Sequence, residues 1–290
     1  MRNYVIVTES TADLPAYMID ELGIKVIPMG FGFENESYLN YPDHRELDIK
    51  EFYSRVKNGE RSTTTLINVK TFEEYFEPIL QAGEDILYVG FSSGLSGTFN
   101  SSIIAAEGLR EKYTDAKIEC IDTLAASMGE GLLVYHAAMK KREGMDIDGV
   151  KNWLLDNRLH MCHWVTVDDL NHLKRGGRIN AMTATLGTAL NVKPIIHVDD
   201  EGHLIPVGNV RGRKKSIQTL FEHMEATSIR PENQVVFISH ADSQEDTEYL
   251  ASLIKEKLNV KDVIYNYIGP VVGSHTGQGA IALFFIGTER

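Results

Sequence analysis

Short apolar runs alternate with amphipathic stretches through the first half of the chain. Continuous β-prone runs bounded by turn residues are typical of strands that are buried on both faces of a parallel sheet. Such runs occur at Tyr4–Thr8, Val26–Phe33, Asp85–Gly90 and Lys117–Asp122. The stretches between them predict helices, which include Val69–Gln81, a helix that begins near Thr98, and Ser127–Lys141. This alternation predicts a parallel sheet flanked by helices.

The second half has a different pattern. Two strand-like runs, Val192–Val198 and Leu204–Val210, are joined across the polar segment Asp199–Gly202, which predicts a hairpin that a purely parallel fold lacks. Further strands are expected at His160–Thr166, Val235–His240, Val263–Ile268 and Ala280–Ile286, and Gly269–Gly279 is expected to be a glycine-rich loop. We therefore predict an α/β protein with two domains, 1–158 with a parallel sheet and 159–290 with a mixed sheet and helices.

The strand Asp85–Gly90 runs directly into a loop rich in serine and glycine, residues 90–97, which leads into a helix. A loop between a strand and a helix N-terminus gathers unpaired N–H groups and hydroxyls, so it is suited to bind an anion. The loop lacks the lysine of a Walker motif and the dinucleotide-binding fingerprint, which disfavours a phosphate site. A loop that only caps the helix remains an alternative.

Two other chemistries fit this loop. Gly90–Gly94 matches the G-x-S-x-G elbow of serine hydrolases, with Ser92 as the nucleophile and His240 or His275 as the base. In such an elbow the helix starts immediately after the serine, whereas here the loop continues to Gly97. The remaining interpretation is that the loop hydroxyls of Ser92, Ser93 and Ser96 bind a carboxylate and perform no chemistry.

Composition and charge limit the possible partners. The 290 residues are 43% hydrophobic and 24% charged, which is typical of a globular protein with one or two domains. The net charge of -12 disfavours nucleic acid as a partner, because neutralising phosphates requires clustered Lys and Arg. The two cysteines, Cys120 and Cys162, form no C-x-x-C pair, and no run is long enough for a signal peptide or an integral membrane segment. We expect a cytoplasmic protein that has no metal and no cofactor.

Several motifs follow one another in order across nearly the whole chain. They are ESTADLP, the threonines at 63–65, FSSGLSGTFNSS, IDTLAASMGEG, LKRGGRIN, VKPII, RGRKKS and GPVVGSHTGQGA. In this order they resemble the DegV family, bacterial fatty acid-binding proteins that act as acyl-carrying subunits of a fatty acid kinase. The resemblance implies two α/β domains that hold a long-chain fatty acid in an apolar channel, with its carboxylate near the cleft between them.

The resemblance also implies which residues bind the carboxylate. The matching hydroxyls and imidazole are those of Thr64, Thr65, Ser92, Ser93, Ser274, His275 and Thr276, with Gly94 and Arg178 in support. Among these, Thr64, Ser93 and His275 are the expected direct contacts. Met29, Met128, Met139 and Met182 are candidates to line an adaptable acyl channel, although methionines at apolar helix positions are more often ordinary core residues.

The resemblance further implies a role in substrate presentation. The chain would dock on a separate ATP-dependent kinase and hold the carboxylate for acyl-phosphate formation, a step of phospholipid synthesis. The densest basic cluster of this acidic chain, Arg211, Arg213, Lys214 and Lys215, is the candidate docking surface. The chain has no Walker or kinase motif, so we expect no ATP turnover by the chain alone. A lipid sensor without a kinase partner is the third interpretation, beside the serine hydrolase.

Overall fold

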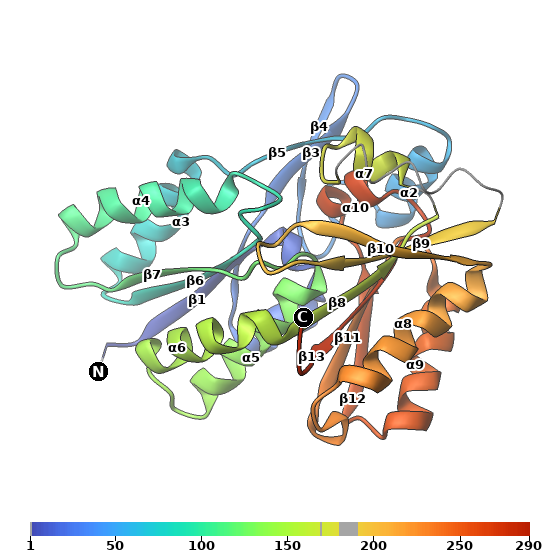
Figure 1. Ribbon diagram of the computed structural model, residues 1–290. Coiled ribbons are helices and arrows are strands. Elements are labelled where there is room, and N and C mark those ends of the chain that lie inside the picture. The colour runs from blue at the N-terminus through green and yellow to red at the C-terminus, as the bar shows by residue number, and fades with distance from the viewer. Residues whose placement is uncertain (1, 169, 180–190) are drawn as a thin grey trace.

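The computed structural model describes residues 2–168, 170–179 and 191–290, and its strands form three sheets (Figure 1). The elements of the first half are β1 (Tyr4–Glu9), η1 (Ser10–Ala12), α1 (Ala16–Leu22), β2 (Lys25–Ile27), β3 (Met29–Phe33), β4 (Glu36–Asn40), α2 (Ile49–Lys57), β5 (Thr63–Thr65), α3 (Val69–Gln81), β6 (Asp85–Gly90), α4 (Thr98–Lys112), β7 (Ile118–Asp122), α5 (Met128–Arg142) and α6 (Ile147–Asn157). Those of the second half are η2 (Arg158–His160), β8 (Met161–Thr166), α7 (Asn171–Arg175), β9 (Val192–Val198), β10 (Leu204–Arg211), α8 (Arg213–Thr227), η4 (Pro231–Asn233), β11 (Val235–His240), α9 (Gln244–Leu258), β12 (Asp262–Tyr267), α10 (Pro270–Thr276) and β13 (Ile281–Ile286).

The first sheet is parallel, in the order β2-β1-β6-β7. Every residue of β1 and β6 is buried, as expected for continuous apolar strands that are covered on both faces. Because β1 and β6 are adjacent and parallel, the loops at their carboxyl ends lie at the same edge of the sheet. A buried side chain joins these loops, since the Glu9 carboxylate accepts a hydrogen bond from the Phe91 N–H at 2.9 Å.

The second sheet has the order β10-β9-β8-β13-β11-β12. Only β11 and β12 run parallel, and the other neighbours are antiparallel, including the predicted β9–β10 hairpin. The prediction of an α/β fold with a parallel sheet and a mixed sheet is confirmed. The described strands of the parallel sheet all precede Arg158 and those of the mixed sheet all follow it, while the division into two domains stays a prediction.

Helix α5 connects the two sheets. It contacts β1 and β6 of the parallel sheet and also β8, β11 and β13 of the mixed sheet. Its residues Met128, Leu132 and Leu133 are fully buried, in a hydrophobic cluster that also contains Phe237 and Phe284 of the mixed sheet. The largest core therefore draws on both halves of the chain.

A third, antiparallel sheet, β4-β3-β5, is not predicted by the sequence pattern. The stretch around β4 has the composition of a turn, and Thr63–Thr65 has that of a solvated loop. Both form strands because β3 lies between them, pairing Phe31 with Tyr38 on one side and with Thr64 on the other. Such short polar strands depend on a tertiary partner, which single-sequence patterns do not reveal.

The prediction of a loop across Gly269–Gly279 is wrong for its first part, which forms helix α10. Pro270 occupies the first turn, where its missing N–H is not needed. Gly273 allows this helix to pack closely on α2, since a Cβ atom there would lie 2.7 Å from the Tyr53 hydroxyl oxygen. Burial of Pro270, Val271 and Gly273 thus compensates for a low helix propensity.

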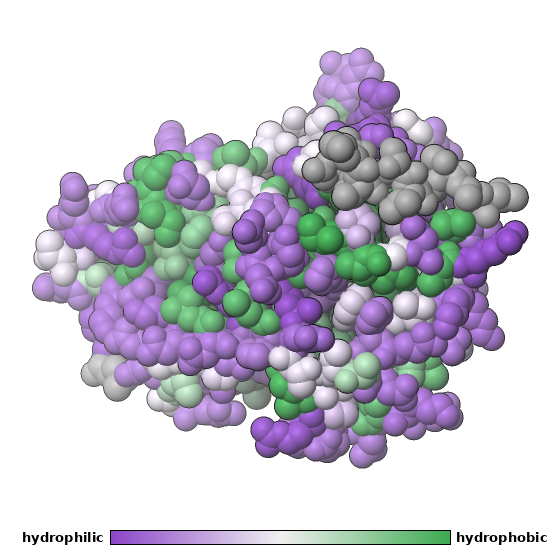
Figure 2. Space-filling view, in the orientation of Figure 1, coloured by the Kyte–Doolittle hydropathy of each residue, from purple (hydrophilic) through white to green (hydrophobic). Residues whose placement is uncertain are grey.

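The surface mixes polar and apolar side chains (Figure 2). Apolar side chains gather over the β9–β10 region of this face, where Ile205 and Val207 of the edge strand are among the exposed residues. No helix among the described residues is long and apolar enough to cross a membrane. Within the same residues, no group of His, Cys, Asp and Glu is arranged to hold a metal ion.

Candidate ligand-binding site

A mostly apolar cavity lies between the mixed sheet and the loops at the carboxyl edge of the parallel sheet, and it is partly open to solvent. Both halves of the chain line it, for example through Phe91 and Leu95 from the first half and Ile196 and Phe284 from the second. The polar side chains on its wall are those of Thr11, Thr64, Ser96, Ser127, His163, Arg178, His275 and Thr276. Such a cavity suits a long apolar ligand that carries few polar groups.

Five of these polar residues form one contiguous group, which we call the head cluster: Thr64, Ser96, Arg178, His275 and Thr276. Its centre is a hydrogen bond of 3.0 Å between Thr64 Oγ1 and His275 Nε2. Strand β5 explains why Thr64 reaches the cavity, since alternate side chains of a strand point to opposite faces. Thr63 and Thr65 are accordingly exposed, and Thr65 is absent from the cavity wall.

His275 is neutral near pH 7. Burial, together with the positive charge of Arg178, lowers the pKa of His275 to about 4. Its Nδ1 atom has no hydrogen-bond partner among the described residues. Nδ1 faces Gly176, where a Cβ atom would lie only 2.3 Å away. The glycine therefore leaves room for the imidazole ring.

Arg178 supplies a permanent charge to the head cluster and also fixes its geometry. Its Nε donates to the Leu95 carbonyl at 3.2 Å and its Nη1 to the Gly176 carbonyl at 2.5 Å. Burial lowers the pKa of Arg178, but a guanidinium stays charged at any physiological pH. The side chain thus ties the serine loop to α7 and places a cation at the cavity wall.

The serine loop presents Ser96 to the cavity, while Ser92 and Ser93 point elsewhere. Ser92 is buried, and its hydroxyl donates to the Gly202 carbonyl at 2.9 Å. The Ser93 residue is exposed, and its N–H donates to Asp122 Oδ1 at 3.2 Å. Gly94 packs against the tip of the β9–β10 hairpin, since a Cβ atom there would lie 2.7 Å from the Glu201 carbonyl oxygen.

The remaining predicted contacts lie at different places. Ser274 is near the head cluster but absent from the cavity wall, because its hydroxyl bonds Ser62 Oγ at 2.6 Å and the Pro270 carbonyl at 2.7 Å. Of the four methionines, Met29 lines the cavity, Met128 and Met139 belong to α5 without lining it, and Met182 lies outside the described residues.

The sequence-based list omits three polar residues of the cavity wall, Thr11, Ser127 and His163, and names Ser96 only among the loop hydroxyls. A signal for Ser96 exists in the sequence. Leu95 is an aliphatic residue in an otherwise small and polar part of the loop, and it marks where the loop turns inward. Ser127 has an unusual backbone, with φ 53° and ψ -143°, which no sequence pattern indicates.

Buried carboxyl groups support the wall behind Thr11 and Ser127. Asp13 Oδ2 lies 2.6 Å from Ser127 Oγ, and Asp13 Oδ1 accepts the Gly269 N–H at 2.9 Å. Glu130 accepts hydrogen bonds from Thr8 and Thr11 at 2.9 and 3.1 Å. Burial raises the pKa of Asp13 to about 7 and raises that of Glu130 well above its ordinary value.

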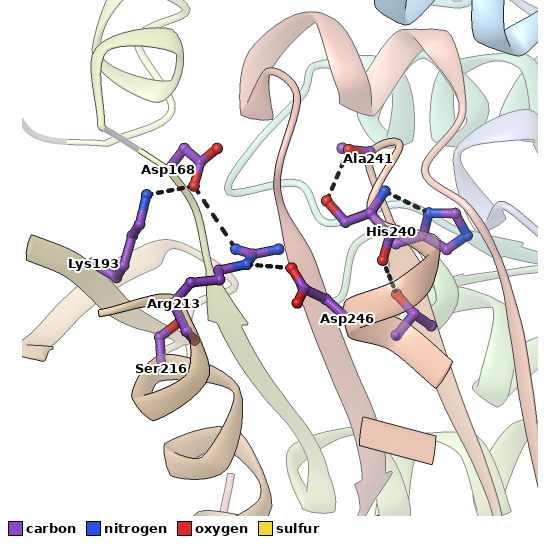
Figure 3. A network of polar contacts seen from close by, with 9 residues as sticks. Asp168, Lys193, Arg213, Ser216, His240, Ala241 and Asp246 are labelled. Atoms are coloured by element: carbon purple, nitrogen blue, oxygen red, sulfur yellow. Dashed lines mark hydrogen bonds and ion pairs between the residues drawn. The ribbon is translucent and has the colours of Figure 1, made fainter. Parts of the chain in front are cut away.

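The basic cluster at the start of α8 is partly neutralised (Figure 3). Arg213 Nε donates to Asp246 Oδ2 at 2.7 Å, and Arg213 Nη1 lies 3.9 Å from Asp168 Oδ1. Asp168 also pairs with Lys193 at 2.5 Å. The Asp168 carboxylate lies against Gly279, four residues beyond His275, so this network adjoins the head cluster.

The other members of the basic cluster face solvent. Arg211, Lys214 and Lys215 are exposed. Lys215 pairs with Glu222 at 2.8 Å, and Lys214 Nζ lies 5.6 Å from the centre of the Tyr249 ring. The cluster is therefore a solvent-facing surface with Arg213 as its fixed member.

The histidine proposed as an alternative base for Ser92 has another partner. His240 Nδ1 accepts the Ser243 N–H at 3.2 Å, as Figure 3 shows for the loop after β11. Its ring contacts Tyr267, with the ring centres 4.4 Å apart. Among the described residues, no histidine is hydrogen-bonded to Ser92.

Comparisons with known proteins agree on one family. A model of the family described as "Uncharacterised protein, DegV family" matches residues 3–288. A DegV domain-containing protein of Clostridium perfringens is 46% identical over 290 residues, which are 100% of this chain and 99% of the relative. A solved structure of a DegV family protein from Thermus thermophilus, described by its fatty acid binding, has a TM-score of 0.89 and 28% identity, with 99% of this chain and 100% of that chain covered. A stearic acid-binding protein from Eubacterium ventriosum shares the fold, with a TM-score of 0.87, 24% identity and 98% of each chain covered.

Proposed function

Because the chain belongs to the DegV family, we propose that it binds a long-chain fatty acid in the cavity that both halves of the chain line. The observation that carries this proposal is the pairing of an apolar cavity with one contiguous head cluster of hydroxyls, an imidazole and a guanidinium. The fatty acid binding described for the Thermus thermophilus relative supports it.

The apolar wall explains how the tail is held. Removing a methylene group from water contributes about 0.8 kcal/mol, so a long chain gains a large gross free energy from burial. Association and ordering offset part of that gain. Chain length and unsaturation are then selected by the depth and bend of the apolar wall, which includes Val165, Ile196 and Phe284.

The head cluster explains how the carboxylate is held. A carboxylate without partners is costly to bury, and charge-assisted hydrogen bonds compensate for that cost. The hydroxyls of Thr64 and Ser96 can donate hydrogen bonds, and Arg178 supplies the opposite charge, whereas the Thr276 hydroxyl donates to the Val272 carbonyl at 3.4 Å. Neutral His275 acts through Thr64: when Nε2 carries the proton and donates to Thr64 Oγ1, the threonine hydroxyl is free to donate to the ligand.

The direct test is mass spectrometry of the organic extract of the purified protein. We expect a near-stoichiometric long-chain fatty acid in the wild type and depletion in Thr64→Val and His275→Ala variants. Thr65→Val is the matched control, because Thr65 is the exposed neighbour on the opposite face of β5. An empty wild type that also fails to bind added stearic acid would contradict the proposal.

We extend the proposal to presentation of the carboxylate to a separate ATP-dependent kinase that forms the acyl-phosphate. The chain would then contribute by holding the carboxylate in line with the phosphoryl group, because phosphoryl transfer depends mainly on alignment and charge stabilisation. The basic cluster supports this role, since Arg213 connects through Asp168 to the segment that follows His275. Arg211 and Lys214 would contact the kinase or its nucleotide.

The kinase proposal is tested by adding a purified bacterial fatty acid kinase subunit and ATP, and measuring acyl-phosphate. We expect a Lys214→Ala, Arg211→Ala double variant to lower the rate while fatty acid binding is unchanged. Lys257→Ala is the control, since Lys257 lies eleven residues from Asp246 along α9, about 16 Å from the Arg213 contact. Equal rates of acyl-phosphate formation for the wild type and all variants would show that the basic cluster does not contact the kinase. No acyl-phosphate in the wild type would favour the lipid sensor.

The serine hydrolase stays the alternative enzyme and has a separate test. Ser92 lacks a histidine partner among the described residues, and its hydroxyl already bonds the Gly202 carbonyl. Thr64 and His275 form a hydroxyl–imidazole pair, but His275 Nδ1 lacks the carboxylate that orients the base of a triad. We therefore expect no labelling of the wild type by a fluorophosphonate probe, and labelling lost in Ser92→Ala would reverse this conclusion.

A further inference from the structure

A second polar group lies on the cavity wall, apart from the head cluster. It consists of Thr11, Ser127 and His163, which line the cavity and are 1%, 4% and 1% exposed. The fatty acid tail proposed above has no group that could hydrogen-bond to them. Buried polar atoms are costly when they lack partners, so a ligand with a hydrogen-bonding group at this position would be favoured over a purely apolar one.

The bonding of His163 defines what that occupant must offer. Its Nδ1 lies 2.8 Å from the Met161 carbonyl oxygen, which can only accept, so Nδ1 carries the proton. Burial lowers the pKa of His163 well below its ordinary value, and the ring is neutral. The other nitrogen, Nε2, is thus a bare acceptor, and it has no hydrogen-bond partner among the described residues. The Nε2–Cδ2 edge of the ring packs closely against Gly129 of α5, since a Cβ atom there would lie 2.3 Å from Nε2.

The two hydroxyls of the group are also left as acceptors. Thr11 donates its proton to Glu130 Oε2 at 3.1 Å and retains its lone pairs. Ser127 Oγ is bonded to Asp13 Oδ2 at 2.6 Å and to Ser239 Oγ at 2.9 Å. A hydroxyl has one proton and two lone pairs, so these two bonds leave one lone pair on Ser127. All three side chains can therefore receive a hydrogen bond from a donor in the cavity.

Helix α10 leads from the neighbourhood of this group to the head cluster. Gly269, which precedes α10, donates its N–H to Asp13, the partner of Ser127, whereas His275 lies near the end of α10. Six residues at about 1.5 Å each separate the two positions by roughly 9 Å. A fatty acid whose carboxylate lies at His275 would pass Ser127 with the interior of its chain.

We propose that the preferred ligand is a hydroxy fatty acid, whose hydroxyl lies within the chain and donates a hydrogen bond to the group formed by Thr11, Ser127 and His163. This inference rests on the proposed function, because it requires the carboxylate to occupy the head cluster. The chain hydroxyl satisfies a buried acceptor, which an unsubstituted chain leaves unpaired.

The test compares binding of stearic acid with binding of a series of hydroxystearic acids whose hydroxyl moves along the chain. Competition with a fluorescent fatty acid measures each affinity. We expect affinity to peak for a hydroxyl in the interior of the chain, about tenfold above stearic acid, the gain typical of one satisfied hydrogen bond. The isomer with the hydroxyl beside the carboxyl group is the positional control and should show no gain.

Variants separate a bonded hydroxyl from a merely tolerated one. Ser127→Ala and Thr11→Val keep the cavity closed while removing acceptors. Because one hydroxyl donates one hydrogen bond, we expect one of these two changes to reduce the tenfold preference severalfold. Ser239→Ala is the control, because Ser239 bonds Ser127 but is not part of the cavity wall, and the preference should survive.

Three outcomes are decisive. If stearic acid binds but no hydroxyl position improves the affinity, or if the preference persists in both acceptor variants, the inference is overturned while the proposed function stands. If neither stearic acid nor any hydroxystearic acid binds, the proposed function itself fails. A peak in the interior of the chain that Ser127→Ala or Thr11→Val abolishes supports the inference.

Discussion

Replacing Ser96 with alanine tests which face of the serine loop meets the ligand. Ser96 lines the cavity beside Leu95, whose carbonyl accepts a hydrogen bond from Arg178 at 3.2 Å, whereas Ser93 is exposed three residues earlier. A hydrogen bond to a charged group contributes about 1.5–3 kcal/mol. We therefore expect Ser96→Ala to weaken fatty acid binding by about ten- to a hundredfold. Ser93→Ala, in the same loop, should change it by less than about twofold.

The same substitution has a structural cost that must be separated from the loss of binding. Ser96 Oγ accepts the Thr98 N–H at 3.2 Å just before α4, so its removal costs about 1 kcal/mol of stability, the usual net contribution of one hydrogen bond. That corresponds to a fall of about 2 °C in the melting temperature for a chain of this size. Isothermal titration at a temperature well below unfolding measures the affinity independently. Equal affinities for Ser96→Ala and wild type, or a larger loss for Ser93→Ala, would refute the assignment.

Two further predictions follow from other contacts. Gly176→Ala places a Cβ atom 2.3 Å from His275 Nδ1, so we expect at least a tenfold loss of fatty acid binding, measured by titration. Gly177→Ala is the neighbouring control. Its Cβ atom meets no atom within 4 Å, although the backbone φ of 69° is strained for alanine. Equal affinity in Gly176→Ala would mean that the His275 ring position is irrelevant. Because burial raises the pKa of Asp13 to about 7, the folded state retains a proton that the unfolded chain has lost, and stability should fall as pH rises from about 4 to about 7. Asp13→Asn should flatten this fall by up to about 4 kcal/mol in urea unfolding, and an unchanged pH slope would show that Asp13 ionises normally in the folded protein.

The sequence predicts an element of this fold when the element's own apolar pattern stabilises it, and fails to predict an element that depends on contacts with a distant segment. Strands β6 and β11 have the predicted bounds, since their continuous apolar runs are buried whatever surrounds them. Strand β5 and helix α10 are not predicted. Thr63–Thr65 pairs only with β3, and Gly273 is accommodated in α10 by close packing against α2.

The site follows the same rule. Thr64 and His275 come together as the motif order suggests, and their residue types indicate hydrogen bonding to a carboxylate. The choice between Ser93 and Ser96 depends on a turn in which the N–H groups of Leu95 and Ser96 both point back to the Ser92 carbonyl, and composition does not specify such a turn. Ser127 enters the cavity wall through a positive φ at the start of α5, which has no sequence signature for a serine.

Because both halves of the chain line the cavity and α5 contacts strands of both the parallel and the mixed sheet, ligand binding is thermodynamically linked to the folding of both halves together. A ligand that binds only this assembled state adds RT ln(1 + [L]/Kd) to its stability, about 2.7 kcal/mol at a hundredfold excess over Kd. Neither half gains that increment alone. Loading should therefore make the whole chain melt in one cooperative transition, and loss of the ligand should expose any difference in stability between the halves.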